Sequence, residues 1–492
     1  MTEKTTTKPS HVDVLIVGAG LSGICAAYHL QASCPNKTYA IFEGRERLGG
    51  TWDLFRYPGI RSDSDMYTLG FSFRPWTNPK AIADGPAILA YIRETAAAYG
   101  IDRKIRYGHR VERARWSSRD EVWTVEARDV DTGRTVVVTC NFLFMCAGYY
   151  DYEEGYTPEF PGRERFAGTM VHPQKWGPDV AYEGKRVVVI GSGATAVTLV
   201  PELSRRAAHV TMLQRSPTYI TSLPAQDPVA DWMRGRVPDE AAYAITRWKN
   251  VLIGMAFYQA CRRFPDRAKR LLVGQVKKQL RGTADVDQHF TPSYNPWDQR
   301  LCLVPNGDLF KAIREGRASV VTDHIDTFTE RGIRLKSGDE LEADVIVTAT
   351  GLKLKFLGGL DVEVDGKHVE PSETMAYKGM MLSDVPNLAL AIGYTNASWT
   401  LKCELTAMYV CRLLKHMDEH GYARCCPRRN ASVTEEPLLT FSSGYVQRAI
   451  HAFPRQGSRA PWRVYQNYAL DRLMLKRRPV DDGEMDFTRA RR

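Results

Sequence analysis

The chain has 492 residues, of which 43% are hydrophobic and 25% are charged, with a formal net charge of +10 at neutral pH. This composition excludes wholesale disorder and provides for two or three hydrophobic cores, so we expect a multidomain globular protein. The positive charge is scattered and accompanies no RNA- or DNA-binding motif, so we expect no nucleic-acid partner. A basic surface does suit anionic dinucleotides.

The ten cysteines include no pair with C-x-x-C spacing, and several of them lie in apolar segments. This pattern is typical of reduced thiols rather than of a disulfide framework or a zinc site, so we predict no metal. The first ten residues lack the apolar stretch of a signal peptide, and no apolar run approaches the roughly 18 residues of a membrane span. We therefore expect a cytoplasmic protein whose N-terminal tail is frayed.

Residues 11 to 43 have the pattern of a strand, a tight turn, a helix, a second strand and an acidic residue. Gly18, Gly20 and Gly23 follow a short β-branched run at G-x-G-x-x-G spacing. The first glycine allows the turn, the second lets backbone approach a pyrophosphate, and the third lets the helix pack closely on the sheet. Glu43 ends the second strand, where a carboxylate accepts hydrogen bonds from ribose hydroxyls. The pattern predicts a dinucleotide-binding unit.

Residues 45 to 71 are rich in glycine, aspartate, arginine and aromatic residues and show little periodicity, which predicts a functional loop. Thr51 offers a hydroxyl and Trp52 a flat aromatic face, although an ordinary buried turn is the alternative. Asp63 has a helix cap as its alternative role. A helix from residue 84 toward 99 and strands near 105–116, 123–127 and 142–146 complete the first part of a domain that we place at residues 1–150.

A second strand-turn-helix unit follows a stretch, residues 149–162, whose composition is typical of a domain crossing. In this unit Gly191 and Gly193 have the fingerprint spacing, and Ala196 takes the third position, which the pattern tolerates. Its second strand ends in Gln214, followed by Arg215 and Ser216 instead of an acid. Because an arginine there suits a 2′-phosphate, we expect NADP rather than NAD.

The rest of the chain is predicted to return to the first domain after an insertion. We expect a second domain at residues 151–224 and 293–350, a basic helical insertion at 225–292, and completion of the first domain by 351–492. The insertion is expected to pack over an active site, with contact to a membrane surface or a partner helix as the alternative. Arg300 lies on an aromatic and polar loop, and residues 476–492 are expected to be a surface tail.

One motif between the two fingerprints is specific. The sequence FAGTMVHPQKW resembles the signature of Baeyer-Villiger monooxygenases, class B flavoproteins that use FAD and NADPH. Phe166, Gly168, His172 and Trp176 match it, whereas Gly177 departs from its last position. The stretches RYPGIRSDSDMYTLGF, NPWDQRLCLVPNGDLF and GYTNASWTLK are similar to the ethionamide-activating branch, and the similarity covers nearly the whole chain. The resemblance implies an α/β fold with two Rossmann-like domains, one for FAD and one for NADP, and a helical insertion.

The resemblance also implies the site residues. Arg300 matches the active-site arginine, Asp63 matches the aspartate that orients it, and His172 matches a residue that coordinates the two domains. Many relatives have a lysine that contributes to the 2′-phosphate where this chain has Gln299, so more of the NADP preference depends on Arg215. The FAD contacts implied are Gly18, Gly20, Ser22, Gly23, Glu43, Thr51, Trp52, Asp53, Leu54, Asp63 and the backbone near Val111. The NADPH contacts are Gly191, Ser192, Gly193, Ala194, Thr195, Ala196, Arg215, Ser216 and Trp462.

The implied activity is insertion of one oxygen atom of O2 next to a ketone carbonyl, through a peroxyflavin, to give an ester or lactone. Sulfides and thioamides are further expected substrates, and a flavin-dependent S- or N-oxygenase is the alternative function. Disulfide reductases with two dinucleotide sites need a redox cysteine pair, which is absent here. A flavin-binding module without catalysis would need neither a second fingerprint nor a charged loop arginine. The sequence predicts no oligomeric state.

Overall fold

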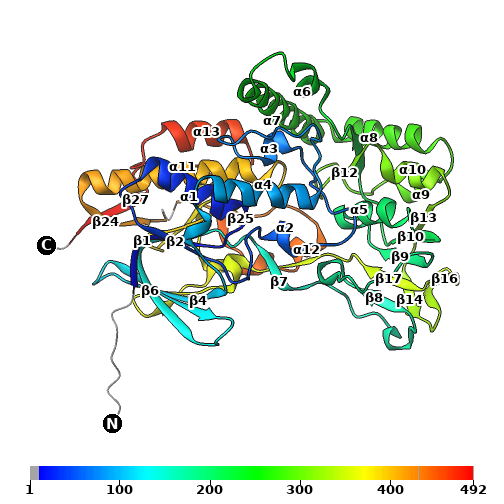
Figure 1. The fold of residues 1–492 in the computed structure, drawn as a ribbon, viewed down its shortest axis with the longest axis horizontal. Helices are drawn as coiled ribbons and strands as arrows, with labels where there is room; N and C mark the ends of the chain where they lie inside the picture. The colour runs from blue at the N-terminus through cyan, green and yellow to red at the C-terminus, as the bar shows by residue number, and fades with distance from the viewer. Residues whose placement is uncertain (1–9, 430–431, 491–492) are drawn as a thin grey trace, which may run out of the picture.

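The computed structural model describes residues 10–429 and 432–490, so most of the expected N-terminal tail lies outside the described residues. Both ends of the described chain build one half of the molecule, blue and orange to red in Figure 1, and the middle of the chain builds the other half in green. Each half contains its own β-sheet. The predicted α/β class with two dinucleotide-type sheets is confirmed.

The first sheet has nine strands in the order β20-β19-β4-β5-β6-β1-β2-β3, and β23 also pairs with β6. The central strands β2, β1, β6 and β23 run parallel, and the helices α1, α4 and α11 pack together over this sheet. Their bounds are β1 (Ser10–Val17), α1 (Leu21–Ser33), β2 (Tyr39–Phe42), α4 (Gly85–Ala98), β3 (Ile105–Arg106), β4 (His109–Ser117), β5 (Val122–Asp129), β6 (Thr135–Met145), β19 (Asp361–Val364), β20 (Lys367–His368), β23 (Leu388–Leu390) and α11 (Trp399–His420).

The second sheet is parallel throughout, in the order β13-β10-β9-β17-β8. Its central strands are Val- and Ile-rich and almost fully buried, as expected for a sheet with both faces covered. A small antiparallel sheet, β14-β15-β16, adjoins it. The bounds are β8 (Thr169–Val171), β9 (Arg186–Ile190), α5 (Ala194–Leu203), β10 (His209–Gln214), α10 (Asp308–Arg314), β13 (Ala318–Thr322), β14 (Ile325–Phe328), β15 (Gly332–Leu335), β16 (Glu340–Glu342) and β17 (Val345–Thr348).

The two crossings between the halves lie side by side. The strand β7 (Tyr150–Gly155), inside the stretch expected to be a linker, pairs antiparallel with β18 (Leu352–Leu354). The chain leaves the first half and re-enters it through this one paired ribbon. The covalent connections between the two halves therefore lie at one place.

The region predicted as a helical insertion consists of α6 (Pro228–Met233), α7 (Asp239–Arg263), α8 (Pro265–Leu280) and α9 (Val286–His289). Strands β11 (Ile220–Leu223) and β12 (Cys302–Pro305) flank it and pair in parallel at its base. The long helix α7 packs on α3 (Met66–Leu69) of the first half, and α6 and α7 project at the top of the molecule in Figure 1. The helical prediction for this region is confirmed.

Two local expectations are corrected. The loop at residues 45–71 contains two single-turn helices, α2 (Thr51–Leu54) and α3. The expected surface tail at 476–492 is wrong for its described part, because α13 (Tyr468–Arg477) extends into it and β27 (Met485–Arg489) pairs with β24 (Tyr422–Pro427). Met485 and Phe487 pack against the main core, which holds this segment in place. The remaining elements are β21 (Ala376–Tyr377), β22 (Met381–Leu382), β25 (Glu435–Pro437), α12 (Gly444–Gln447) and β26 (Arg455–Gly457).

Candidate cofactor and active site

The first glycine turn has the geometry that the fingerprint predicts. Gly18 has a φ of +105°, and a Cβ atom added there would lie 2.6 Å from the carbonyl oxygen of Cys146. A Cβ on Gly23 would lie 1.9 Å from the carbonyl oxygen of Gly18, so α1 packs directly on the turn. Gly20 faces Gly50, whose Cα would lie 3.5 Å from an added Cβ. Only glycine fits at the first and third positions, and the second lies against the following loop.

Both predicted dinucleotide helices begin without a capping side chain. No side chain accepts a hydrogen bond at the start of α1 or α5, whereas Asp84 caps α4 and Asp227 caps α6. The first N–H groups of a helix need acceptors and attract anions. The glycine turns and the two uncapped termini therefore fit the pyrophosphate groups of two dinucleotides.

Glu43 lies at the end of β2, as predicted, and is buried. Its carboxylate accepts hydrogen bonds from the backbone N–H of Ala19 at 2.7 Å and of Arg45 at 3.0 Å. Burial raises the pKa of Glu43, and these two backbone donors oppose that shift. The contacts fix the orientation of the carboxylate against the first turn.

The other expected FAD contacts are engaged with protein groups. Asp53 is fully buried, and its carboxylate forms ion pairs with Arg45 at 2.9 Å and Arg93 at 3.3 Å. The Ser22 hydroxyl accepts a hydrogen bond from the Trp399 indole at 2.9 Å. The half-buried residues of this group are Thr51, Trp52, Leu54 and Val111.

The second glycine turn repeats the first with two differences. Gly191 has a φ of +133°, and an added Cβ would lie 2.3 Å from the carbonyl oxygen of Ala349. Around Gly193, an added Cβ would meet nothing within 4 Å. Ala196 is fully buried, so α5 leaves room for a methyl group where α1 requires Gly23. Ser192 donates a hydrogen bond to the Ser216 carbonyl at 3.1 Å; Ala194 and Thr195 form the first turn of α5.

The end of β10 presents an unpaired arginine. Gln214 is buried and donates hydrogen bonds to the His289 carbonyl at 2.7 Å and to the Thr322 hydroxyl at 2.8 Å. Arg215 and Ser216 are exposed, and Arg215 forms no ion pair with any described residue. The guanidinium is therefore available for an anionic ligand, as the sequence predicts.

Arg300 and Asp63, 237 positions apart in the sequence numbering, form an ion pair. The guanidinium Nη2 lies 2.6 Å from Oδ2 of Asp63, and the two side chains are 34% and 36% exposed. The negative charge of Asp63 raises the pKa of Arg300, which is a cation at any working pH in any case. The expectation that Asp63 orients Arg300 is confirmed as geometry; their catalytic role stays a prediction.

Sequence reasoning missed a group of tyrosines near Arg300. Tyr149 and Tyr150, with hydroxyl oxygens 3.4 Å apart, and Tyr445 all interact electrostatically with this arginine. Burial raises the pKa of all three phenols, so they are neutral donors at neutral pH. The signal was the density of tyrosines in the predicted crossing, which by itself indicated only a linker.

His172 packs against the ribbon formed by β7 and β18. Its Nε2–H donates to the Gly351 carbonyl at 3.1 Å, and its Nδ1 accepts from the Gln174 N–H at 3.2 Å. A Cβ on Gly155 of β7 would lie 1.9 Å from the ring, so the imidazole packs flat on that strand. Burial lowers the pKa of His172 and favours the neutral ring. This histidine of the second half thus contacts β7 and the residue that precedes β18; its coordinating role stays a prediction.

The expected contact between Trp462 and NADP stays a prediction, and the structure places this ring inside the protein. The indole has no exposed surface and packs edge-on against Tyr377 in the core of the first half, with ring centroids 5.4 Å apart. Trp462 was an expected contact only through the family resemblance, and tertiary packing places its ring in the core. Asn467, which follows it in the sequence, caps α13.

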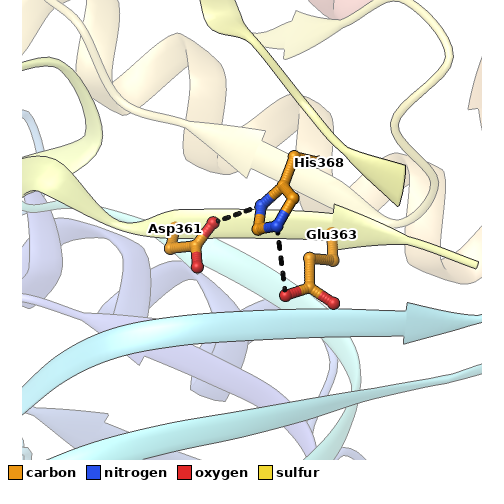
Figure 2. A group of neighbouring side chains, drawn as sticks. All are labelled: Asp361, Glu363 and His368. Carbon is orange, nitrogen blue, oxygen red and sulfur yellow. Dashed lines mark hydrogen bonds and ion pairs between the residues drawn. The ribbon is translucent and has the colours of Figure 1, made fainter. Parts of the chain in front are cut away.

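A histidine and two carboxylates form a second polar group, remote in sequence from the fingerprints. On the strands β19 and β20, Nδ1 of His368 lies 3.0 Å from Oδ1 of Asp361, and its Nε2 lies 3.9 Å from Oε1 of Glu363. Figure 2 shows the imidazole between the two carboxylates. Arg113 also contacts Asp361, at 3.2 Å. Because a resident arginine and the imidazole already serve these carboxylates, the group is explained as a surface ion-pair network.

All ten cysteines are buried and free in the structure. Cys302 lies beside the second glycine turn, with its Sγ 3.9 Å from the Ser192 carbonyl, and burial raises its pKa to about 12. Cys403 accepts a hydrogen bond from Ser22 beside the first turn, and burial raises its pKa to about 12 as well. In the part of the chain that the structure describes, no helix has the length and apolar character needed to cross a membrane.

Comparisons with known proteins agree with this geometry. The family described as flavin-binding monooxygenase-like matches residues 75–421, and an NAD(P)-binding Rossmann-like domain matches residues 16–81. The chain is 56% identical to the FAD-containing monooxygenase EthA of Mycobacterium tuberculosis, over 97% of this chain and 98% of the relative. It is 48% identical to the probable FAD-binding monooxygenase AlmA of Acinetobacter baylyi, over 97% and 96% of the two chains.

Two solved structures share the fold over 98% of this chain and 100% of their own. One is an oxidised steroid monooxygenase bound to NADP, with a TM-score of 0.78 and 23% identity. The other is a cyclohexanone monooxygenase bound to epsilon-caprolactone, with a TM-score of 0.75 and 19% identity. Given the two dinucleotide turns, the family match over most of the chain and the identity to EthA over nearly its full length, the chain belongs to the flavin-binding monooxygenase-like family.

Proposed function

We propose that this chain is an FAD- and NADPH-dependent monooxygenase that inserts one oxygen atom of O2 next to a ketone carbonyl, giving an ester or lactone. Sulfides and thioamides are further substrates of the same site. The ion pair between Arg300 and Asp63 is the observation that carries the proposal, because it joins the two units. Asp63 belongs to the loop after the first glycine turn, and Arg300 lies two residues before Cys302, which contacts the second turn.

We assign FAD to the unit formed by residues 1–150 and 351–492, and NADPH to residues 151–224 and 293–350. Support comes from the acid that ends β2 in the first unit and the unpaired arginine that follows β10 in the second. The flavin, when bound, accepts hydride and activates O2, which is chemistry that protein side chains cannot supply. The residues of this chain bind the two dinucleotides, orient them and exclude water.

Arg300 stabilises negative charge during oxygen transfer. Attack of an oxygen nucleophile on a ketone places charge on the carbonyl oxygen, and a preorganised cation stabilises that charge more than it stabilises the neutral ketone. A guanidinium does this without donating its proton, because it stays charged at any working pH. Asp63 holds the guanidinium in place through the 2.6 Å contact.

The test is the variant Arg300→Ala, assayed for ester and hydrogen peroxide together after the visible spectrum has shown that flavin is bound. We expect FAD to be retained and ester formation to fall by at least about 10²-fold, the usual loss for one preorganised donor, with NADPH oxidation diverted to peroxide. Arg206→Ala is the matched control, since Arg206 is exposed and pairs with Glu183 on the surface of the second unit. It should keep ester formation within about twofold.

Near wild-type ester formation by Arg300→Ala would overturn the role of Arg300. The reaction class is tested separately, by product analysis of the wild-type enzyme against matched ketones and sulfides. Ester or lactone from at least one ketone supports the proposal. Formation of sulfoxides alone would replace it with the S-oxygenase function.

A further inference from the structure

We propose that the insertion is a docking surface for an anionic lipid bilayer, through an apolar face on α6, α7 and α8. The prominent residues of this face are exposed to an unusual degree: Trp232 is 65% exposed, Ile253 60% and Leu271 66%. Single exposed apolar residues are ordinary on protein surfaces, but a group of them on neighbouring helices marks an interaction site. The apolar face comprises Val229, Trp232, Ile245, Trp248, Leu252, Ile253, Phe257, Phe264 and Leu271.

The middle of α7 presents an uncharged outer side and buries an arginine on its inner side. Its exposed side chains between residues 241 and 260 are all uncharged, and Ile245, Trp248 and Leu252 follow one another at helical spacing. On the inner side, Arg247 is buried and donates to the carbonyls of Tyr67 at 2.8 Å and Gly70 at 2.7 Å. Because the buried arginine is satisfied, this orientation is a stable feature of the fold.

Cations without carboxylate partners border the apolar face. Arg236 lies over the Trp232 ring at 5.7 Å, and both Arg263 and Arg267 lie over the Phe264 ring, at 5.9 and 5.6 Å. Aromatic rings beside cations are typical of the boundary between lipid headgroups and acyl chains. Arg236, Arg263, Arg267, Arg270, Lys278 and Arg281 form no ion pair with a carboxylate of any described residue.

The net positive charge of the insertion favours an anionic lipid bilayer over a second copy of this chain as the binding partner. Residues 225–292 contain twelve basic and seven acidic residues, which is half of the net charge of +10. Two such faces pressed together would bring like charges close, whereas an anionic bilayer surface attracts each basic residue by about 1 kcal/mol. In Figure 1, α6 and α7 project at the top of the molecule.

The face is connected to the loop that carries Arg300. The ring of Tyr258 on α7 packs edge-on against Trp297 with centroids 5.5 Å apart, and Arg262 contacts Asp298 at 2.6 Å. A docked molecule would therefore hold this loop near the bilayer, which favours apolar substrates dissolved in the membrane. This consequence rests on the proposed function, whereas vesicle binding does not.

The test is flotation of the FAD-loaded enzyme with phosphatidylcholine vesicles that contain or lack phosphatidylglycerol. We expect binding to the anionic vesicles, weakened by added salt. The combined change Trp232→Ser, Leu252→Ser and Ile253→Ser should lower the partition coefficient at least about 10-fold, since it removes the inserted apolar groups. The combined change Arg263→Gln, Arg267→Gln and Lys278→Gln should lower it by a similar factor for anionic vesicles.

The matched control is Val130→Ser with Val137→Ser, which removes exposed apolar side chains from β6 and the turn that precedes it and should leave binding unchanged. Flavin content and Tm show that each variant is folded. The proposal is overturned if the wild type does not float, if it binds both vesicle types equally, or if the serine variant binds like the wild type. A dimer seen by light scattering that the serine changes abolish would overturn it in favour of self-association.

Discussion

The two dinucleotide units share a turn and differ in what surrounds it. In the first, Gly20 lies against Gly50, Gly23 lies against Gly18, and the terminal acid is buried and bonded to backbone. In the second, nothing lies within 4 Å of a Cβ added to Gly193. The arginine beyond its terminal Gln214 is exposed and unpaired. The first turn is enclosed and the second is open.

We propose that this difference reflects two kinds of cofactor. A flavin is used repeatedly within one enzyme molecule, so an enclosed site does not slow turnover. NADPH is consumed and must leave as NADP in every cycle, which requires an open site with contacts that form and break. We infer that the enclosed unit holds a resident FAD and that the open unit exchanges the nicotinamide cofactor.

The largest expected effect is that of Gly23→Ala. The added Cβ would lie 1.9 Å from a backbone oxygen that cannot move without distorting the first turn. We expect a loss of about 3 kcal/mol or more of folding free energy, together with loss of bound FAD. Chemical denaturation and the visible spectrum measure both.

Gly193→Ala is the matched change in the open unit. Since nothing lies near the added methyl group, stability and FAD content should change little, by less than about 0.5 kcal/mol. Affinity for NADPH should fall, because this glycine faces the uncapped start of α5. Equal damage from both substitutions would remove the distinction between the units.

Arg215→Ala tests the exposed end of the open unit. The change should weaken the binding of NADPH relative to that of NADH by about 1.5 to 3 kcal/mol, since it removes a charge-assisted contact with the 2′-phosphate. The measurement is the ratio of kcat/KM for the two cofactors. Arg205→Ala, in the same unit and paired with Glu202, should leave the ratio unchanged. An unchanged ratio in Arg215→Ala would show that another residue selects NADPH.

A smaller effect is expected at the ribbon that joins the units. The pKa of His172 is lowered in the folded protein, so the unfolded chain binds this proton more readily. The stabilising contribution of the neutral ring is present above the ordinary histidine pKa of about 6.5 and is lost as pH falls below it. In His172→Gln, Tm should depend less steeply on pH in that window. If the Tm of His172→Gln depends on pH in the same way as that of the wild type, His172 is not the source of the pH dependence.

The smallest effect is expected from thiol alkylation, which should leave turnover unchanged. Each unit has a buried cysteine beside its turn, Cys403 or Cys302, and burial raises the pKa of both to about 12. At neutral pH neither is a reactive thiolate. Iodoacetamide labelling followed by mass spectrometry and assay checks this, with denatured protein as the positive control. Cys302→Ser should also keep its activity, and inactivation with flavin still bound would contradict the bystander role.

Features within one strand-turn-helix unit were predictable from the sequence. Contacts between residues that are distant in the sequence were not. The glycine turns, the acid at Glu43 and the free Arg215 follow from spacing within a single strand-turn-helix unit, so a short window of sequence specifies them. Asp63 and Arg300 were paired only through the family resemblance, because nothing local connects two residues on different loops. Trp462 matched a motif equally well, but its ring lies in the core.

The error at the C-terminus has a clear physical cause. The C-terminal segment has the composition of a surface tail, yet β27 is held by pairing with β24 across a long separation in the chain. This pairing is a contact between distant segments, which composition and periodicity do not encode.

The most direct test of the central claim is the cofactor content of the enzyme after saturation with FAD and NADP and extensive dialysis. The account predicts that about one FAD per chain remains in the enclosed unit while NADP is removed from the open one. Retention of NADP, or loss of FAD at a similar rate, would contradict it.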